Sequence, residues 1–214
     1  MSVGIYVLAA GKSMRFGTPK LDAPCAGRAL GAWALAAIEA ADLAPGTIIV
    51  PPSTPHFASE AQRHDWTLAI NEDAERGLSS SLARAIRHAE DAAHDAACIF
   101  LADMPLITAR HVRTIAASGQ PDQPVATFYP GGRLGVPARL PLALFAALNS
   151  GAADVGAAAL LAAQPTLRAM TEGADLHDVD SPADMARAEA VLMARLANRG
   201  ARLDGAPIAR AADG

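Results

Sequence analysis

Residues 4–20 read Gly-Ile-Tyr-Val-Leu-Ala-Ala-Gly-Lys-Ser-Met-Arg-Phe-Gly-Thr-Pro-Lys, and this stretch decides how the rest of the chain is interpreted. Its first five residues are mostly apolar and β-prone, which predicts a buried strand. The small residues that follow allow backbone N–H groups to approach an anion closely. Lys12, Arg15 and Lys20 can neutralise several phosphate oxygens at once. The stretch therefore predicts a strand followed by a loop that binds a triphosphate.

Two common phosphate-binding loops do not fit this stretch. A Walker loop requires a glycine five residues before Gly11, where the sequence has Tyr6. A dinucleotide-binding fingerprint requires a glycine in place of Ser13. The remaining alternative is a glycine-containing turn whose cations are simply solvated. The number of defined positions after a single strand favours phosphate binding over that alternative.

The composition fits one compact domain. The chain has 214 residues, of which 51% are hydrophobic, and this is enough to bury a full core. We expect residues 1–196 to form a single domain and residues 197–214, rich in Ala, Gly, Arg and Asp, to form a flexible tail. No apolar run approaches the roughly 20 residues of a membrane helix, and no basic leader is present. We therefore expect a cytoplasmic protein with no membrane partner.

Charge and cysteine content exclude two further classes of function. The formal net charge is -4 and Lys and Arg form no cluster, whereas binding to a nucleic-acid backbone needs a basic patch. Cys25 and Cys98 are too few for a disulfide framework and lack the spacing of metal ligands. The expected partners are therefore small molecules, with no nucleic acid.

Short β-type runs alternate with Ala- and Leu-rich segments along the chain. The alternation predicts an α/β fold with a doubly wound, mostly parallel, Rossmann-like sheet. In such a sheet ligands bind beyond the carboxyl ends of the strands, where the loop described above would lie. The predicted strands cover residues 5–8, 47–50, 67–70, 97–101 and 125–128.

Three helices are also expected. The 3.6-residue period of helices packed on a sheet appears in two apolar sets. Ser181 before Pro182 predicts an N-cap and a first turn, opening a helix that ends at about Leu196. The two apolar sets are Leu30, Trp33, Ala37 and Ile38, and Leu82, Ala85, Ile86 and Ala89.

Aspartates follow the predicted strand 97–101 and precede the last helix. Asp103 would lie at the carboxyl end of a central strand, where burial of a carboxylate is costly without a cation. Mg²⁺ prefers oxygen ligands and takes one or two protein carboxylates plus substrate phosphates. Asp103 is therefore the first candidate metal ligand and Asp180 the second, with Asp178 held in reserve. The alternative is that these aspartates only stabilise turns or cap helices.

Four motifs together carry a resemblance to a known family. The pattern Leu-Ala-Ala-Gly-x-Ser-x-Arg-x-Gly-x-x-Lys at residues 8–20 resembles the signature of nucleotidyltransferases that make molybdenum-cofactor dinucleotides and nucleotide sugars. Residues 101–105 resemble that family's Gly-Asp-Met-Pro motif, and residues 178–184 its Asp-Ile-Asp-Thr-Pro-Glu-Asp motif. Residues 71–82 resemble the Asn-x-x-x-x-x-Gly-Met-Ser-Ser-Ser-Leu stretch of molybdenum cofactor cytidylyltransferases.

The resemblance implies a nucleotidyltransferase fold and a set of site residues. The catalytic residues would be Arg15, Lys20 and Asp103, and the ligands of Mg²⁺ would be Asp103 and Asp180. From the residues alone, capping of a helix explains the serines after Gly77 better than nucleotide binding does. The nucleotide-binding residues implied are Leu8, Ala9, Ala10, Gly11, Lys12, Ser13, Asn71, Gly77, Ser79 and Ser80.

The same resemblance implies a donor and an acceptor. Leu-Ala-Ala-Gly, rather than Leu-Ala-Gly-Gly, is typical of the enzymes that take CTP, so Ala10 indicates CTP over GTP. The expected reaction transfers CMP to the phosphate of molybdopterin and releases pyrophosphate. A molybdoenzyme or its chaperone is a candidate protein partner. The alternatives are guanylyl or other nucleotidyl transfer to a different phosphorylated acceptor, and a non-catalytic nucleotide-binding regulatory module.

The acceptor side departs from the family pattern. Val136 stands where the family has a histidine or a polar residue, and Ala158 stands where it has an arginine. Arg133 and Arg139 are candidates to replace the missing positive charge, although each alone is more often a solvated surface cation. The motifs therefore identify the donor better than the acceptor.

Overall fold

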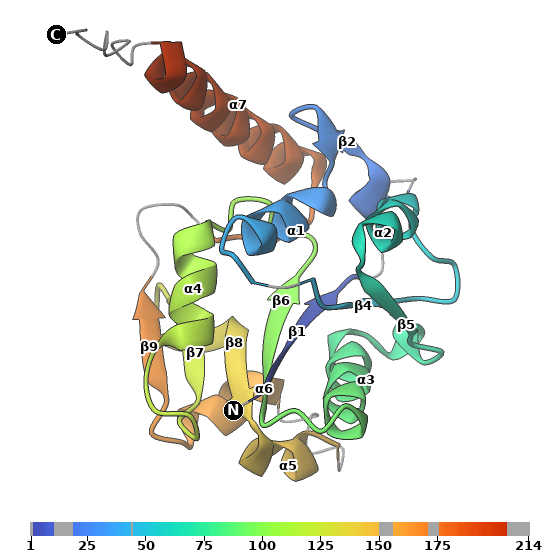
Figure 1. Ribbon diagram of the computed structural model, residues 1–214, viewed down its shortest axis with the longest axis vertical. Helices are drawn as coiled ribbons and strands as arrows, with labels where there is room; N and C mark the ends of the chain where they lie inside the picture. The colour runs from blue at the N-terminus through green and yellow to red at the C-terminus, as the bar shows by residue number, and fades with distance from the viewer. Residues whose placement is uncertain (1, 11–18, 44, 150–155, 171–175, 205–214) are drawn as a thin grey trace, which may run out of the picture.

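The computed structural model describes residues 2–10, 19–43, 45–149, 156–170 and 176–204. A seven-stranded sheet with the order β5-β4-β1-β6-β8-β7-β9 forms its centre (Figure 1). The sheet is mostly parallel and β8 runs antiparallel to both its neighbours, so the predicted fold class is confirmed. The strands are β1 (Val3–Leu8), β4 (Thr47–Val50), β5 (Thr67–Ile70), β6 (Ala96–Leu101), β7 (Val125–Tyr129), β8 (Arg133–Pro141) and β9 (Leu167–Met170).

All five predicted strands form, and two strands of the sheet were not predicted. The connection from β7 to β8 is a short hairpin in which Gly131 and Gly132 both have a φ of +84°. Glycine adopts this left-handed backbone without a steric cost, so the chain reverses here with no crossover helix. This hairpin makes β8 antiparallel. The segment Leu167–Met170 (β9) then pairs in parallel with the outer side of β7.

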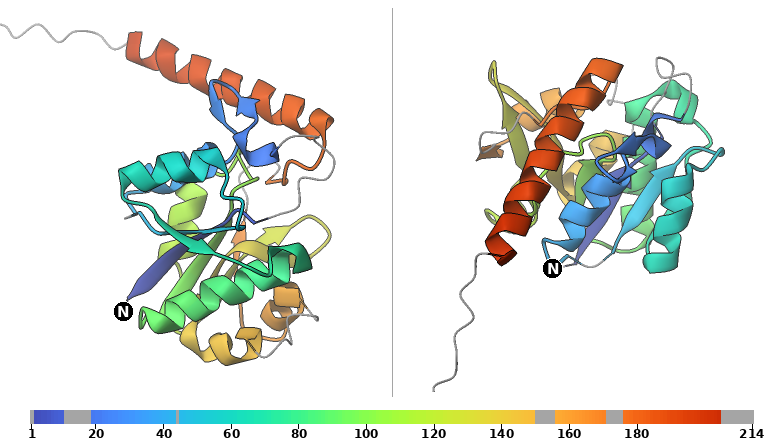
Figure 2. Two further views of the ribbon diagram at one scale, coloured as in Figure 1. Left: turned by 90° about the vertical axis from the view of Figure 1, so that its right-hand side faces the viewer. Right: turned by 90° about the horizontal axis from the view of Figure 1, so that it is seen from above.

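Helices cover both faces of the sheet (Figure 2). Alternate side chains of β1 point to opposite faces. Ile5 and Val7 belong to one buried cluster, and Tyr6 and Leu8 to the other. The first cluster packs under α1 (Ala32–Glu39), α2 (His56–Ala61) and α4 (Ala109–Ala117), and the second under α3 (Leu78–Asp91), α5 (Phe145–Asn149) and α6 (Gly156–Ala162).

The helical face predicted from the second apolar set is confirmed, and the first is corrected. Leu82, Ala85, Ile86 and Ala89 of α3 are all buried. In α1 the buried residues are instead Ala34, Leu35 and Ile38, whereas Trp33 and Ala37 are only partly buried. The reason is that Leu30 precedes the helix, which begins at Ala32, so Leu30 does not define which face of α1 is buried.

The last helix, α7 (Pro182–Asp204), lies across the end of the molecule toward which β6 points (Figure 1). Ser181 is its N-cap: Asp184 N–H donates to Ser181 Oγ over 3.2 Å, and the Asp184 carboxylate accepts from Ser181 N–H over 2.9 Å. The helix continues past Leu196 to Asp204, because Ala, Leu and Arg are good helix formers. Residues 197–204 of the expected tail are therefore helical, and residues 205–214 lie outside the described residues.

Two smaller features complete the described part of the chain. A two-stranded hairpin, β2 (Pro24–Cys25) and β3 (Arg28–Ala29), precedes α1, and its Ala26 N–H donates to Glu189 of α7 over 3.0 Å. Among the described helices, none combines the length and the apolar character that crossing a membrane requires.

Candidate active site

Asp103 lies at the carboxyl end of the central strand β6. Ala102 N–H donates to the carbonyl of Leu8 over 3.0 Å, which continues the pairing of β6 with β1 by one residue. Met104 N–H then donates to the carbonyl of Leu101 over 3.4 Å and closes a turn. These two backbone hydrogen bonds therefore hold Asp103 at the carboxyl end of a central strand, where the sequence predicted it.

The segment before α7 brings two more carboxylates to the same place. Val179 N–H donates to the carbonyl of Asp103 over 2.9 Å, and the Val179 side chain is buried. The flanking residues Asp178 and Asp180 are exposed. Carboxylate oxygens of Asp103, Asp178 and Asp180 all lie within 4.8 Å of one another. We call these three residues the acidic cluster.

Lys20 provides the positive charge of the acidic cluster. It opens the 3₁₀ turn η1 (Lys20–Asp22), and its side chain is only 8% exposed. Its Nζ donates to Asp103 Oδ2 over 2.9 Å and to Asp180 Oδ1 over 3.5 Å. A buried ammonium needs such partners, since desolvation without pairing is costly. The sequence predicted a role for Lys20 on phosphate but not its contact with these carboxylates.

The pKa of Asp103 is raised above its usual value. Burial is the main cause because it disfavours the ionised carboxylate, and the negative charge of Asp178 acts in the same direction. The Lys20 ammonium opposes both effects through its charge and its hydrogen bond. Among the described residues, three carboxylates meet the ammonium of Lys20, so further positive charge would stabilise the cluster.

The donor set fits a hard divalent cation. All three side chains of the acidic cluster offer carboxylate oxygens, which Mg²⁺ and Mn²⁺ both accept. Asp103 and Asp180 were the ligands predicted from the sequence, and Asp178 joins them in space. The sequence did contain a pattern that indicates Asp178, because one apolar residue, Val179, separates it from Asp180. When Val179 is buried, both aspartates are exposed on the same side of the chain.

Of the predicted phosphate loop, only the two ends are described. Leu8, Ala9 and Ala10 are buried, and Ala9 N–H donates to the carbonyl of Ile49 over 2.8 Å. These residues hold the start of the loop at the carboxyl edge of β1, on the strand next to β6. Lys20 lies at its other end. The predicted residues Gly11, Lys12, Ser13 and Arg15 lie outside the described residues.

The predicted base-binding segment forms an ordered turn. The side-chain amide of buried Asn71 donates to Ser80 Oγ over 3.0 Å and to Ser81 Oγ over 3.1 Å. Ser80 Oγ lies 2.8 Å from the carbonyls of Asp73 and Gly77. Asn71 and Ser80 therefore shape the backbone of this turn, which follows β5.

Gly77 and Ser79 are both partly exposed in that segment. Gly77 has a φ of +94°, which favours glycine, and no atom lies within 4 Å of the position that a Cβ would take there. Ser79 is partly exposed in the first turn of α3, and neighbouring Leu78 is 53% exposed. The turn thus presents open space and exposed apolar surface.

Arg139 is not available to an acceptor, which corrects one expectation from the sequence. The side chain is 3% exposed. Its guanidinium donates to four backbone carbonyls at the end of α4 and in the following loop, over 2.7–3.2 Å. Arg139 therefore fixes that loop. The carbonyls belong to Ala116, Ser118, Gln120 and Gln123.

The β7–β8 hairpin lies beside the acidic cluster. Tyr129 donates its hydroxyl to the carbonyl of Val136 over 2.5 Å. Burial raises the pKa of Tyr129 to about 12, and the charge of Asp178 contributes to this shift. Arg133 is exposed and its guanidinium lies 5.8 Å from the Tyr129 ring centroid. Of the two arginines named as acceptor-side candidates, Arg133 is thus the exposed one, and Ala158 is also exposed, on α6.

Comparison with known proteins agrees with this geometry. Residues 5–169 match the model of the MobA-like NTP transferase domain. The chain belongs to the MobA-like NTP transferase family. Nucleotidyl transfer is the type of activity that the family indicates, so the expectation of a nucleotidyltransferase is confirmed at that level. The aspartates at positions 178 and 180 lie beyond the matched residues.

Three relatives illustrate the range of this similarity. The purine catabolism protein PucB of Bacillus subtilis is 30% identical over 194 residues, which cover 84% of this chain and 92% of PucB. Rv0371c of Mycobacterium tuberculosis, solved in complex with manganese, is 22% identical with a TM-score of 0.68, covering 89% of this chain and 99% of that one. CMP:2-keto-3-deoxy-manno-octonic acid synthetase in complex with CTP is 12% identical with a TM-score of 0.67, covering 91% and 100%. At these identities the two solved structures support the fold alone.

Proposed function

We propose that this MobA-like NTP transferase moves CMP from CTP to the phosphate of a molybdopterin-type acceptor and releases pyrophosphate. The observation that carries the proposal is the acidic cluster with Lys20. Three carboxylates from two distant segments meet a buried ammonium at the carboxyl edge of the sheet, beside the end of β1 from which the phosphate loop leaves. An anionic triphosphate needs this arrangement of cation ligands and positive charge.

The reaction follows from these positions. An oxygen of the acceptor phosphate attacks the α-phosphorus of CTP, a new P–O bond forms, and the bond to the β-phosphate oxygen breaks in line. Catalysis of this kind is mostly positioning and charge stabilisation. Asp103, Asp178 and Asp180 would hold Mg²⁺, which when bound neutralises charge on the triphosphate. Lys20 orients Asp103 and Asp180 and would supply positive charge to the reacting phosphates, and Arg15, named from the sequence motif, would supply more.

The choice of cytosine as the base rests on the resemblance of sequence motifs and not on contacts in the structure. Ala10 and the segment 71–82 resemble those of cytidylyltransferases, and a structural neighbour was solved with CTP. In this proposal Ser79 hydrogen-bonds the base or ribose, and the open space at Gly77 leaves room for the ring. The product would pass to a molybdoenzyme or to its chaperone.

Substitution of Asp103 by Asn tests the proposal. With CTP, Mg²⁺ and molybdopterin, we expect Asp103→Asn to lower the rate of pyrophosphate release at least about a hundredfold, because one preorganised charge contact is lost. Exposed Asp122, in the loop after α4, is the matched control, and Asp122→Asn should leave the rate unchanged. Near-normal turnover of Asp103→Asn would overturn the proposal.

A thermal-shift comparison of CTP, GTP, ATP and UTP with Mg²⁺ distinguishes the remaining candidates. A ligand that binds only the native state raises the unfolding temperature, so the largest shift identifies the base. We expect CTP to give it. A larger shift with GTP would support the guanylyl alternative, and a CTP shift without pyrophosphate release for any phosphorylated acceptor would support the binding module.

A further inference from the structure

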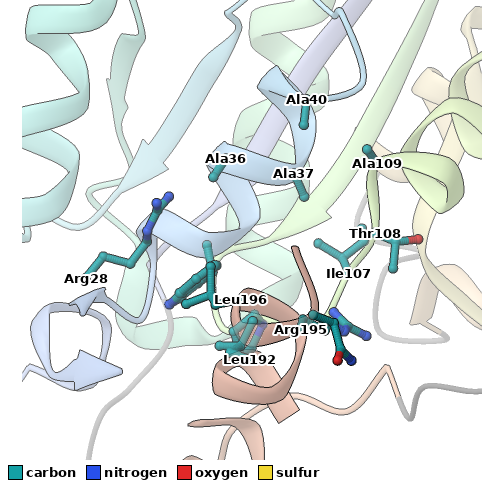
Figure 3. A pocket seen from close by; sticks show the side chains of 13 residues that line it. Arg28, Ala36, Ala37, Ala40, Ile107, Thr108, Ala109, Leu192, Arg195 and Leu196 are labelled. Atoms are coloured by element: carbon teal, nitrogen blue, oxygen red, sulfur yellow. The ribbon is translucent and has the colours of Figure 1, made fainter. Parts of the chain in front are cut away.

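A cavity lies apart from the acidic cluster (Figure 3). Its volume is about 760 Å³, and it opens between α1, α7 and the segment that leads from β6 into α4. This volume is typical of small-molecule sites. The α1 wall includes Trp33 and Ala37, the two residues predicted to be on the buried face of that helix and found only partly buried.

Small and apolar side chains form much of the cavity wall. Ala36, Ala37 and Ala40 lie along one side of α1, and Leu192 and Leu196 of α7 face them (Figure 3). Alanine side chains leave space that larger side chains would fill. From position 33 to position 40 the α1 wall is only about 10 Å long, because a helix rises about 1.5 Å per residue. That length suits a ring system better than a helix of a partner protein.

The charges at this cavity are positive. Arg28 and Arg195 line it, and among its described lining residues there is no Asp or Glu, although the whole chain has a formal net charge of -4. The Arg28 guanidinium lies 4.4 Å from the centroid of the Trp33 ring. Arg195 donates to the carbonyl of Leu106 over 2.9 Å, which holds its guanidinium at the wall. An anionic group is therefore favoured beside an apolar body.

We propose that this cavity, the α1–α7 pocket, binds a small organic anion with an aromatic ring system and one acidic group. The rings pack against the alanine wall and Trp33, and the acidic group lies near Arg28 and Arg195. The site is independent of the nucleotidyl transfer proposed above. It nevertheless contacts the segment after Asp103 and the helix after Asp180, since Pro105 and Leu192 both line it.

Fluorescence titration with 8-anilinonaphthalene-1-sulfonate tests the proposal, because this probe carries aromatic rings and one sulfonate. We expect saturable binding of one probe molecule per folded chain. The neutral analogue N-phenyl-1-naphthylamine should bind more weakly, and Arg28→Gln should weaken binding of the sulfonate about three- to fivefold, the range of a partly exposed charge contact. Arg87→Gln, an exposed change on α3, is the matched control.

A second experiment fills the α1–α7 pocket with a larger side chain. Ala37→Phe should abolish saturable sulfonate binding, whereas Ala190→Phe on the exposed side of α7 should retain it. Circular dichroism and the unfolding temperature establish that both variants fold. Equal affinity for the charged and neutral probes, several equivalent sites per chain, or binding that a folded Ala37→Phe variant retains would each overturn the proposal.

Discussion

Asp178 and Asp180 differ in their immediate partners although both belong to the acidic cluster. Asp180 Oδ1 lies 3.5 Å from Lys20 Nζ. The negative charge of Asp178 instead acts on Tyr129 of the β7–β8 hairpin, whose pKa it helps to raise. Both carboxylates nevertheless reach within 4.8 Å of Asp103. The geometry therefore includes Asp178, the residue that the sequence placed second to Asp180.

We expect Asp178→Asn and Asp180→Asn each to weaken Mn²⁺ binding at least about tenfold, since each removes charge and an oxygen ligand from the cluster. Electron paramagnetic resonance titration of free Mn²⁺ measures this directly. Asp91→Asn, at the exposed end of α3, serves as control. An unchanged Mn²⁺ affinity for either variant would remove that aspartate from the ligand set.

At the scale of the element, the start of α7 is fixed by reciprocal hydrogen bonds. Ser181 Oγ donates to the Asp184 carboxylate over 2.6 Å, and each backbone N–H of the pair bonds the other side chain. The pKa of Asp184 is lowered, with the Ser181 hydrogen bond as the largest cause. Because Asp180 directly precedes this cap, the cap also limits where the Asp180 carboxylate lies.

We expect Ser181→Ala to lower the free energy of unfolding by about 1 kcal/mol, the usual value of an N-cap. Urea denaturation at neutral pH measures it. Ser59→Ala, on the exposed side of α2, should change stability little or slightly raise it. Equal stability of Ser181→Ala and the wild type would show that the cap contributes nothing net.

Arg139 fixes a second element boundary, because one guanidinium binds the carbonyls that follow α4. We expect Arg139→Met to lower the free energy of unfolding by roughly 2–3 kcal/mol, since the partly buried hydrogen bonds from a charged donor to four carbonyls are lost. Arg139→Lys should recover only part of this, because an ammonium cannot match the fork of the guanidinium. Pyrophosphate release per folded molecule should stay near normal, and its loss in a folded Arg139→Lys variant would return Arg139 to the acceptor site.

At the scale of the whole molecule, stability should fall at high pH because of Tyr6. Its hydroxyl is 3.0 Å from His94 Nδ1, and burial raises its pKa from 10.0 to about 12. Folding thus favours the protonated phenol, so its stabilising contribution is complete below pH 10 and is lost as the pH rises through about 12.

Urea denaturation at pH 8, 10 and 11.5 measures this dependence, with Tyr6→Phe for comparison. We expect the variant to lose less stability than the wild type between pH 10 and 11.5. Tyr129 and Cys98, whose pKa values burial also raises to about 12, contribute to the slope that remains. Parallel curves for the two proteins would show that Tyr6 does not titrate with unfolding.

Much of this architecture was predictable from local patterns, and the remainder depends on contacts between distant residues. Strands such as residues 97–101 are predictable because their residues form β-prone apolar runs. Asp103 and Asp180 are predictable as site residues because one follows a strand and the other precedes a helix. β8 was not predicted because the expected pattern joins strands by helices, whereas a hairpin with two glycines joins β7 to β8. No local pattern indicates that Lys20 contacts the acidic cluster or that Arg139 binds a loop, since both contacts form only after folding.

The position of Val179 beside Asp103 has a consequence for the order of events during synthesis. Lys20 and Asp103 leave the ribosome early, whereas Asp178 and Asp180 come after the segment that matches the family model. At translation rates of about 5–20 residues per second, the nascent chain carries only Asp103 of the acidic cluster for roughly 4–15 s before Asp178 and Asp180 are made. The cation site can therefore form only after the segment that carries Asp178 and Asp180 has been synthesised.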